Sequence, residues 1–142
     1  SIGANHLWEP EKITYEATPP SSGNHRPSWA KWGHYSYLPP QRWLHNLEHG
    51  GIALLYHPCA EPAVKDKLLQ YAKAAKPSAG DLLWVLTPYP GLPAAAAAVA
   101  WENVMLAETV THTELDDFVE KFHRKGPEDV GMSGQYSLNW IE

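Results

Sequence analysis

The sequence predicts an α+β fold, with a small, mostly antiparallel sheet, two main helices and a long proline-rich N-terminal arm. Short apolar runs of strand length at residues 51–57 and 82–87 alternate with segments of helical periodicity. Proline accounts for 13 of the 142 residues, well above its usual share, and several prolines precede residue 41. No internal repeat is visible, which excludes solenoid and propeller architectures.

The length of 142 residues is typical of one domain, so we expect a single domain over residues 1–142. Residues 1–40 are broken by Pro, Gly, Ser and Asn and predict a wrapping arm. Within the arm, residues 12–16 and 34–38 have the composition of short strands. Residues 41–142 are predicted to form the α+β core.

The core is predicted to begin with one or two helical turns over residues 41–49. Trp43, Leu44 and Leu47 have near-helical spacing, and the Gly50-Gly51 pair is typical of a helix C-terminus. The apolar, glycine-flanked run that follows at residues 51–57 predicts a buried strand.

Two further elements follow in the same alternation. In residues 61–76, apolar side chains recur at helical spacing on one face and lysines occupy the other, which predicts an amphipathic helix. Pro77 is expected to end this helix. Residues 82–87 predict a second core strand. Residues 94–106 are ambiguous, because their alanines favour a helix whereas Val99, Val104 and their neighbours could line a strand.

The C-terminal part combines a helix with a short strand candidate. Thr111 and Glu114 have the spacing of a capping box and predict a helix that runs to Lys125, where Gly126 and Pro127 close it. The apolar residues within 136–141 predict a strand near the end of the chain.

Charge and cysteine content exclude several classes of function. Lys and Arg number 11 against 16 Asp and Glu, a net charge of −5, so no basic surface is expected to bind nucleic acid. The longest apolar stretch, residues 92–101, is about half the length of a membrane span, so no membrane insertion by this domain is expected. The lone Cys59 excludes an internal disulfide, which leaves packing or a bound ion to stabilise the fold.

The sequence HNLEHGG holds the densest group of potential ligands. If residues 41–49 are helical, His45 and His49 lie four residues apart on one face, where two imidazoles can share an ion. Glu48 could join them as a ligand or orient one of the rings. The spacing also matches the H-x-x-E-H pattern of inverted zinc peptidases, in which Glu is the general base. The alternative is a pair of surface histidines stabilised by the helix dipole.

A further ligand must come from elsewhere in the chain, since zinc usually has four. His25 is the candidate, because prolines on both sides stiffen its loop and Gly23 and Asn24 specify a turn. The alternative is a covering loop with an exposed histidine.

The segments PPSSGNHRPSWAKWGHY and QRWLHNLEHGGIALLYHPCAEP resemble a widespread family of unknown function marked by P-P-x-S-G-x-H and H-x-L-E-H-G. Its bacterial members are typically secreted or membrane-tethered. The residues of these two segments are most similar to those of an animal branch of the family, which includes the extracellular part of a tumour-suppressor-inducible, single-pass membrane protein. The resemblance covers residues 19–127. It implies importance for His25, His45, Glu48 and His49 and an extracytoplasmic location, and it brings no established activity.

Other side chains could extend the site. His34, His57 and Cys59 are candidate extra ligands, whereas a surface position is expected for His6, His112 and His123. Several tryptophans surround the same arm and helix, either as a stacking surface for a protein or glycan partner or as packing that walls the site from water. These are Trp8, Trp29, Trp32 and Trp43.

The leading hypothesis is an extracytoplasmic metal-binding domain that holds zinc or copper through His25, His45 and His49, with Glu48 as a fourth ligand or an orienting group. Imidazole-rich ligation favours zinc or copper(II) over magnesium or calcium, which prefer oxygen. One alternative is a metal-dependent hydrolase with Glu48 as its catalytic base. Another is a tryptophan-rich recognition module. Whether the protein is an enzyme stays open.

Overall fold

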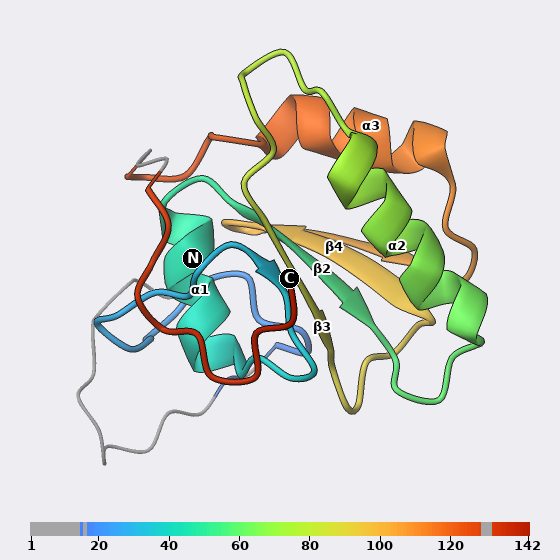
Figure 1. Cartoon of the computed structure of the whole chain (residues 1–142), viewed down its shortest axis with the longest axis horizontal. Helices are drawn as coiled ribbons and strands as arrows, with labels where there is room; N and C mark the ends of the chain where they lie inside the picture. Colours follow the sequence, from blue (N-terminus) through green and yellow to red (C-terminus); the bar gives the residue numbers. More distant parts are fainter. Residues whose placement is uncertain (1–14, 16, 129–131) are drawn as a thin grey trace.

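The computed structural model describes residues 15, 17–128 and 132–142, and within them five strands form one sheet and three helices cover it (Figure 1). The strands are β1 Gly33–His34, β2 Ile52–Tyr56, β3 Trp84–Pro88, β4 Ala96–Ala100 and β5 Asn103–Ala107. The helices are α1 Pro40–Glu48, α2 Pro62–Ala74 and α3 His112–Phe122. The α+β class predicted from the sequence is confirmed.

The sheet is mixed, with the order β1-β3-β2-β4-β5. Strand β3 lies parallel to both β1 and β2, and helix α2 makes the crossover between β2 and β3. The β2–β4 and β4–β5 pairs are antiparallel and contain more of the paired residues, so the sheet is mostly antiparallel as expected.

The two faces of the sheet bury different layers, because neighbouring residues of a strand point to opposite sides. In β2, Ile52 and Leu54 pack into the core formed with α2 and α3. Ala53 and Leu55 pack into a second core together with the buried side chains of α1 and the arm. Figure 1 shows α2 and α3 side by side and apart from α1. The candidate metal ligands belong to the second layer.

Most predicted elements are confirmed with small shifts at their ends. The helices expected over 41–49, 61–76 and from Thr111 are α1, α2 and α3, and the strands expected at 51–57 and 82–87 are β2 and β3. Thr111 caps α3, since its hydroxyl accepts a hydrogen bond from the Glu114 amide at 3.3 Å.

The ambiguous alanine-rich segment forms the β4–β5 hairpin. Every residue of β4 is buried, because the strand lies inside the sheet with a packed layer on each face. Small side chains fit this position, so tertiary packing outweighs the helix propensity of alanine. The hairpin turns at Trp101 and Glu102, whose φ of 66° provides the reversal.

The predictions for the chain ends are corrected in part. Of the strand predicted at 12–16 only Tyr15 is described, and the strand predicted at 34–38 is reduced to β1. The strand predicted at 136–141 is wrong: this tail makes only isolated bridges, Tyr136 with Ala30 and Trp140 with Tyr35. Asn139, with a φ of 66°, interrupts the extended backbone between them. In the described part of the chain, no helix is long and apolar enough to span a membrane.

Candidate metal centre

Three of the predicted ligands converge in the structure. His25 comes from the arm, and His45 and Glu48 come from α1. Their candidate ligand atoms all lie within 4.8 Å of one another. All three side chains are buried, with exposures of 0%, 2% and 5% for His25, His45 and Glu48. The convergence of distant residues, on which the metal hypothesis depends, is therefore present.

The ends of α1 determine where His45 and Glu48 point. Pro40 occupies the first helical position, where its fixed φ favours helix and its missing amide hydrogen is not needed. At the other end the Gly50 amide donates to Leu47 O and the Gly51 amide to Asn46 O, both at 2.9 Å, with Gly50 at a φ of 92°. This is a Schellman motif. It stops the helix just after Glu48, which three-residue spacing puts on the same face as His45.

The same helix fixes the arm segment that carries His25. The Asn46 side chain accepts a hydrogen bond from Ala30 N and donates one to Ala30 O, each at 2.8 Å. The Arg26 amide donates to Gln41 O at 2.8 Å. These bonds place the residues that follow His25 directly on α1, so the motif residue Asn46 has a positioning role.

Each site histidine uses its Nδ1 atom to bind a backbone carbonyl. The pairs are His25 with Gly23 at 2.8 Å, His45 with Arg26 at 2.9 Å and His49 with Glu128 at 3.2 Å. A carbonyl oxygen can only accept, so Nδ1 carries the proton in all three. In the neutral rings the lone pair is then on Nε2, the arrangement normally found in metal-binding histidines.

The separations at Glu48 fit a shared ion better than direct pairing. Glu48 Oε1 lies 3.5 Å from His25 Nε2 and 3.7 Å from His45 Nε2. A charge-assisted hydrogen bond is shorter, at about 2.7–2.9 Å. Two ligand atoms that each lie about 2.1 Å from a tetrahedral zinc ion are about 3.4 Å apart. The donor set is therefore spaced for one small cation.

His49 lies beside the converged trio and is not part of it. Its ring stacks on His45 with centroids 4.7 Å apart and an interplanar angle of 21°. The side chain is 5% exposed, and its Nε2 has no hydrogen-bond partner among the residues that the structure describes. The two imidazoles thus lie one above the other, as the helical spacing predicts. Of the two rings, that of His45 is the one that joins His25 and Glu48 in the converged trio.

Aromatic rings enclose the site. Trp29 packs against His45 and His49, with centroids 5.0 and 4.4 Å away, and Trp101 meets His25 edge-on at 6.2 Å. Sequence reasoning missed Trp101 as a wall of the site, since only the β4–β5 hairpin brings it next to the arm.

The remaining tryptophans of the predicted cluster also pack instead of standing exposed. Trp43 is fully buried in the core, and half-buried Trp32 donates from Nε1 to Met132 O at 3.1 Å. Trp8 lies outside the described residues. The described tryptophans of this cluster, Trp29, Trp32 and Trp43, therefore offer no support for a stacking surface.

Sequence reasoning also missed the segment that closes over the end of α1. The Arg124 amide donates to Gly50 O at 2.7 Å, and the Glu128 amide donates to Glu48 O at 2.8 Å. Between them, a Cβ on Gly126 would lie 2.6 Å from Glu48 O, too close for any side chain. The glycine after α3 therefore permits this segment to support the backbone of Glu48.

The other histidines and Cys59 do not join the cluster in the described part of the chain. His57 Nδ1 accepts a hydrogen bond from the amide of exposed Cys59 at 3.0 Å, which forms a local turn. His112 is exposed, as expected, and His6 lies outside the described residues. His123 was expected at the surface, and that expectation is wrong: it is 1% exposed, and its Nε2 accepts from the Leu83 amide at 2.9 Å.

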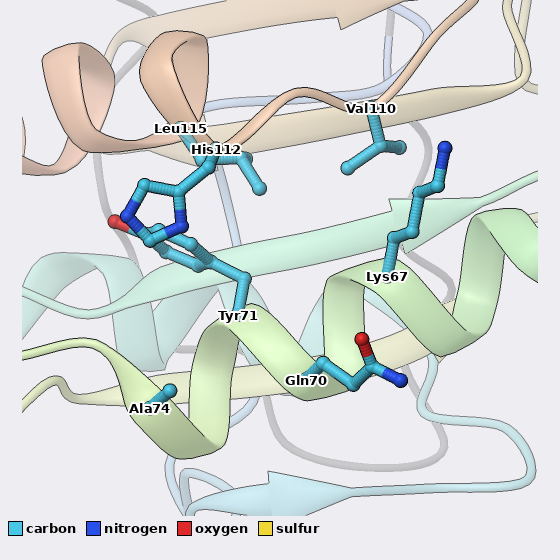
Figure 2. Close-up of a pocket in the computed structure, with 7 residues that line it drawn as sticks. All are labelled: Lys67, Gln70, Tyr71, Ala74, Val110, His112 and Leu115. Atoms are coloured by element: carbon cyan, nitrogen blue, oxygen red, sulfur yellow. The ribbon is translucent and has the colours of Figure 1, made fainter.

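A separate pocket of about 400 Å³ lies between α2 and α3 (Figure 2), and none of the candidate metal ligands lines it. Two of its lining side chains share a partner: Asp116 of α3 accepts from Tyr71 of α2 at 2.8 Å and pairs with His112, also of α3, at 2.9 Å. The bond between Tyr71 and Asp116 joins the two helices. The residues that line the pocket are Lys67, Gln70, Tyr71, Ala74, Val110, His112 and Leu115.

An α+β fold with two histidines and a glutamate converging in its interior defines a candidate metal-binding protein. The family described as "Protein of unknown function (DUF3105)" matches residues 6–135, and the chain belongs to this family. No curated protein and no solved structure matches the chain significantly.

Proposed function

We propose that this chain is an extracytoplasmic metal-binding domain that holds one zinc or copper ion through His25, His45 and Glu48, with His49 as a fourth ligand. The observation that carries the proposal is the convergence of two Nε2 atoms on one Glu48 oxygen while each Nδ1 is held by a carbonyl. His49 is included because its Nδ1 is held in the same way and its buried Nε2 lies on a ring stacked against His45.

The donor atoms support the choice of metal. Imidazole nitrogen and carboxylate oxygen, without thiolate, suit zinc and copper(II). Two histidines and one carboxylate also bind iron(II) in proteins. Elemental analysis therefore has to include iron, and iron as the bound metal would contradict the zinc or copper assignment.

Burial supports a structural centre over a hydrolase. A catalytic zinc site keeps a position open for water or substrate, whereas Trp29 and Trp101 cover a cluster that is nearly inaccessible. The Glu48 Oε1 atom lies 3.5 and 3.7 Å from the two Nε2 atoms, which is the separation expected between ligands of one ion. A catalytic base would lie farther away, beyond a water bound to the metal. The ion would then fasten the arm, through His25, to α1.

The extracytoplasmic location and the animal-branch assignment rest on the resemblance of the two motif segments, both of which lie inside the matched residues 6–135. Protease protection in intact cells that express the full-length protein tests the location. Digestion of this domain from outside the plasma membrane is the expected result, and complete protection contradicts it.

The decisive experiment is elemental analysis of the protein as purified, and again after reconstitution with zinc, copper or iron(II). We expect one ion per chain in the wild type and in His112→Ala, the exposed control, and loss of the ion in His25→Ala and His45→Ala. Metal content that is equal in all four proteins contradicts the site. Glu48→Gln separates the two roles of Glu48, since loss of metal identifies a ligand and retention of metal with loss of a hydrolytic activity identifies a base.

A further inference from the structure

Strand β5 forms an edge of the sheet, and in the described part of the chain it pairs only with β4. It exposes two apolar side chains, Val104 at 41% and Leu106 at 47%. Edge strands are usually protected by lysine, proline or a bulge, and residues 103–107 contain neither proline nor a charged residue. Among the described residues, the outer backbone groups of the strand therefore have no strand partner, and apolar surface lies beside them.

The opposite face of β5 borders a groove of about 240 Å³ next to α3. Met105 points to this side, because its neighbours Val104 and Leu106 point to the other. Phe118 and Phe122 provide apolar lining, and the side chains of Glu114, Asp117 and Lys121 complete it. A strand added beside β5 would therefore meet apolar surface on one face and a groove with two carboxylates on the other.

The charge around this edge is negative. Exposed Glu108 follows β5 in the sequence, and in the described lining of the groove Glu114 and Asp117 add two carboxylates against one cation, Lys121. A second copy of the chain fits poorly, since its own β5 edge would bring the same excess of carboxylates, Glu108, Glu114 and Asp117, against this one. Like charges opposite each other destabilise such a pair.

We propose that β5 is the docking edge for an extended segment of a partner protein in which basic residues alternate with apolar residues. The segment adds a strand to the sheet by main-chain hydrogen bonds to β5, a known mode of peptide recognition. Its apolar side chains pack on Val104 and Leu106, and its basic side chains enter the groove toward Glu114 and Asp117.

The test uses the whole chain and a labelled peptide of alternating valine and lysine, about six residues long, the length of an average strand. Fluorescence anisotropy should show saturable binding that weakens with added salt, and hydrogen exchange should show new protection of the β5 amides. Two peptides serve as controls, one with glutamate in place of lysine and one with alternate backbone amides methylated. Equal binding of all three peptides, or no binding of the lysine peptide, overturns the proposal.

Variants of the chain test the two parts of the surface. Glu114→Gln and Asp117→Asn should each weaken binding about two- to fivefold, as expected for partly exposed ion pairs. Asp66→Asn, an exposed residue of α2 with the same change in charge, should leave binding unchanged. Equal weakening by Asp66→Asn, or a dimer in sedimentation that protects β5 without peptide, contradicts the proposal.

Discussion

At the scale of single residues, the site depends on side chains that position the ligands as much as on the ligands themselves. Asn46 lies between His45 and Glu48 in the sequence, yet it faces the arm and binds both backbone groups of Ala30. Two conclusions could be drawn from the residues alone: His45 and Glu48 share a helical face, and the proline-flanked His25 sits in a stiff loop. The role of Asn46 could not be predicted, because its hydrogen-bond partner belongs to the arm, and the sequence of the helix does not show where the arm lies.

Asn46→Ala should therefore destabilise the protein and weaken metal binding together. It leaves the buried amide and carbonyl of Ala30 without these two bonds, a cost of about 2–4 kcal/mol in the free energy of unfolding. Urea unfolding and zinc titration measure the two effects. Gln70→Ala, which removes an exposed amide side chain from α2, is the matched control. An Asn46→Ala protein as stable as the wild type contradicts the positioning role.

At the scale of elements, α1 and the β4–β5 hairpin show how far sequence reasoning reaches. The glycine pair after α1 predicts its end correctly, because the Schellman motif depends on local backbone conformation. The alanine run of β4 carries no such local signal, and only packing on both faces makes it a strand. The proximity of Trp101 to His25 depends on this hairpin, so it could not be predicted before the hairpin itself.

Gly50→Ala tests the coupling between the end of α1 and the site. A φ of 92° lies in the region that favours glycine, so a Cβ there should cost about 1 kcal/mol. Because Gly50 follows Glu48 and His49 directly, the strain should also reduce metal affinity, which a competition titration measures. Gly91→Ala is the control, since Gly91 has a φ of 83° in open space far from the ligands along the chain. Equal metal affinity in both variants would show that the helix end does not hold the site.

At the scale of the whole molecule, the arm and the C-terminal tail close the sheet edge around β1. Burial lowers the pKa of His34 below its ordinary value of 6.5, and the positive charge of the nearby Lys65 lowers it further. Glu142 has the opposite effect on this pKa, and Lys73 lowers it by the smallest amount. Folded His34 thus stays neutral at a pH where the unfolded chain binds a proton. Stability contributed by this group is present above about pH 6.5 and is lost as the pH falls.

His34→Gln should consequently flatten the loss of stability between about pH 7.5 and about pH 5.5, the range in which imidazoles titrate. The free energy of unfolding in urea, measured at both pH values in the presence of chelator, gives the slope. The assignment fails if the His34→Gln and wild-type proteins lose the same stability on acidification.

A bound ion that fastens the arm to α1 should stabilise the entire fold, because it binds the folded chain at ligands that are far apart once unfolded. At a free metal concentration of about 100 times the dissociation constant, the gain is about 2.7 kcal/mol. For a chain of this length that corresponds to a rise in melting temperature of about 5–10 °C. Calorimetry with metal and with chelator measures the difference. His45→Ala removes a ligand, so its melting temperature should be the same under both conditions, and a wild type that is equally indifferent to chelator would rule out a structural ion.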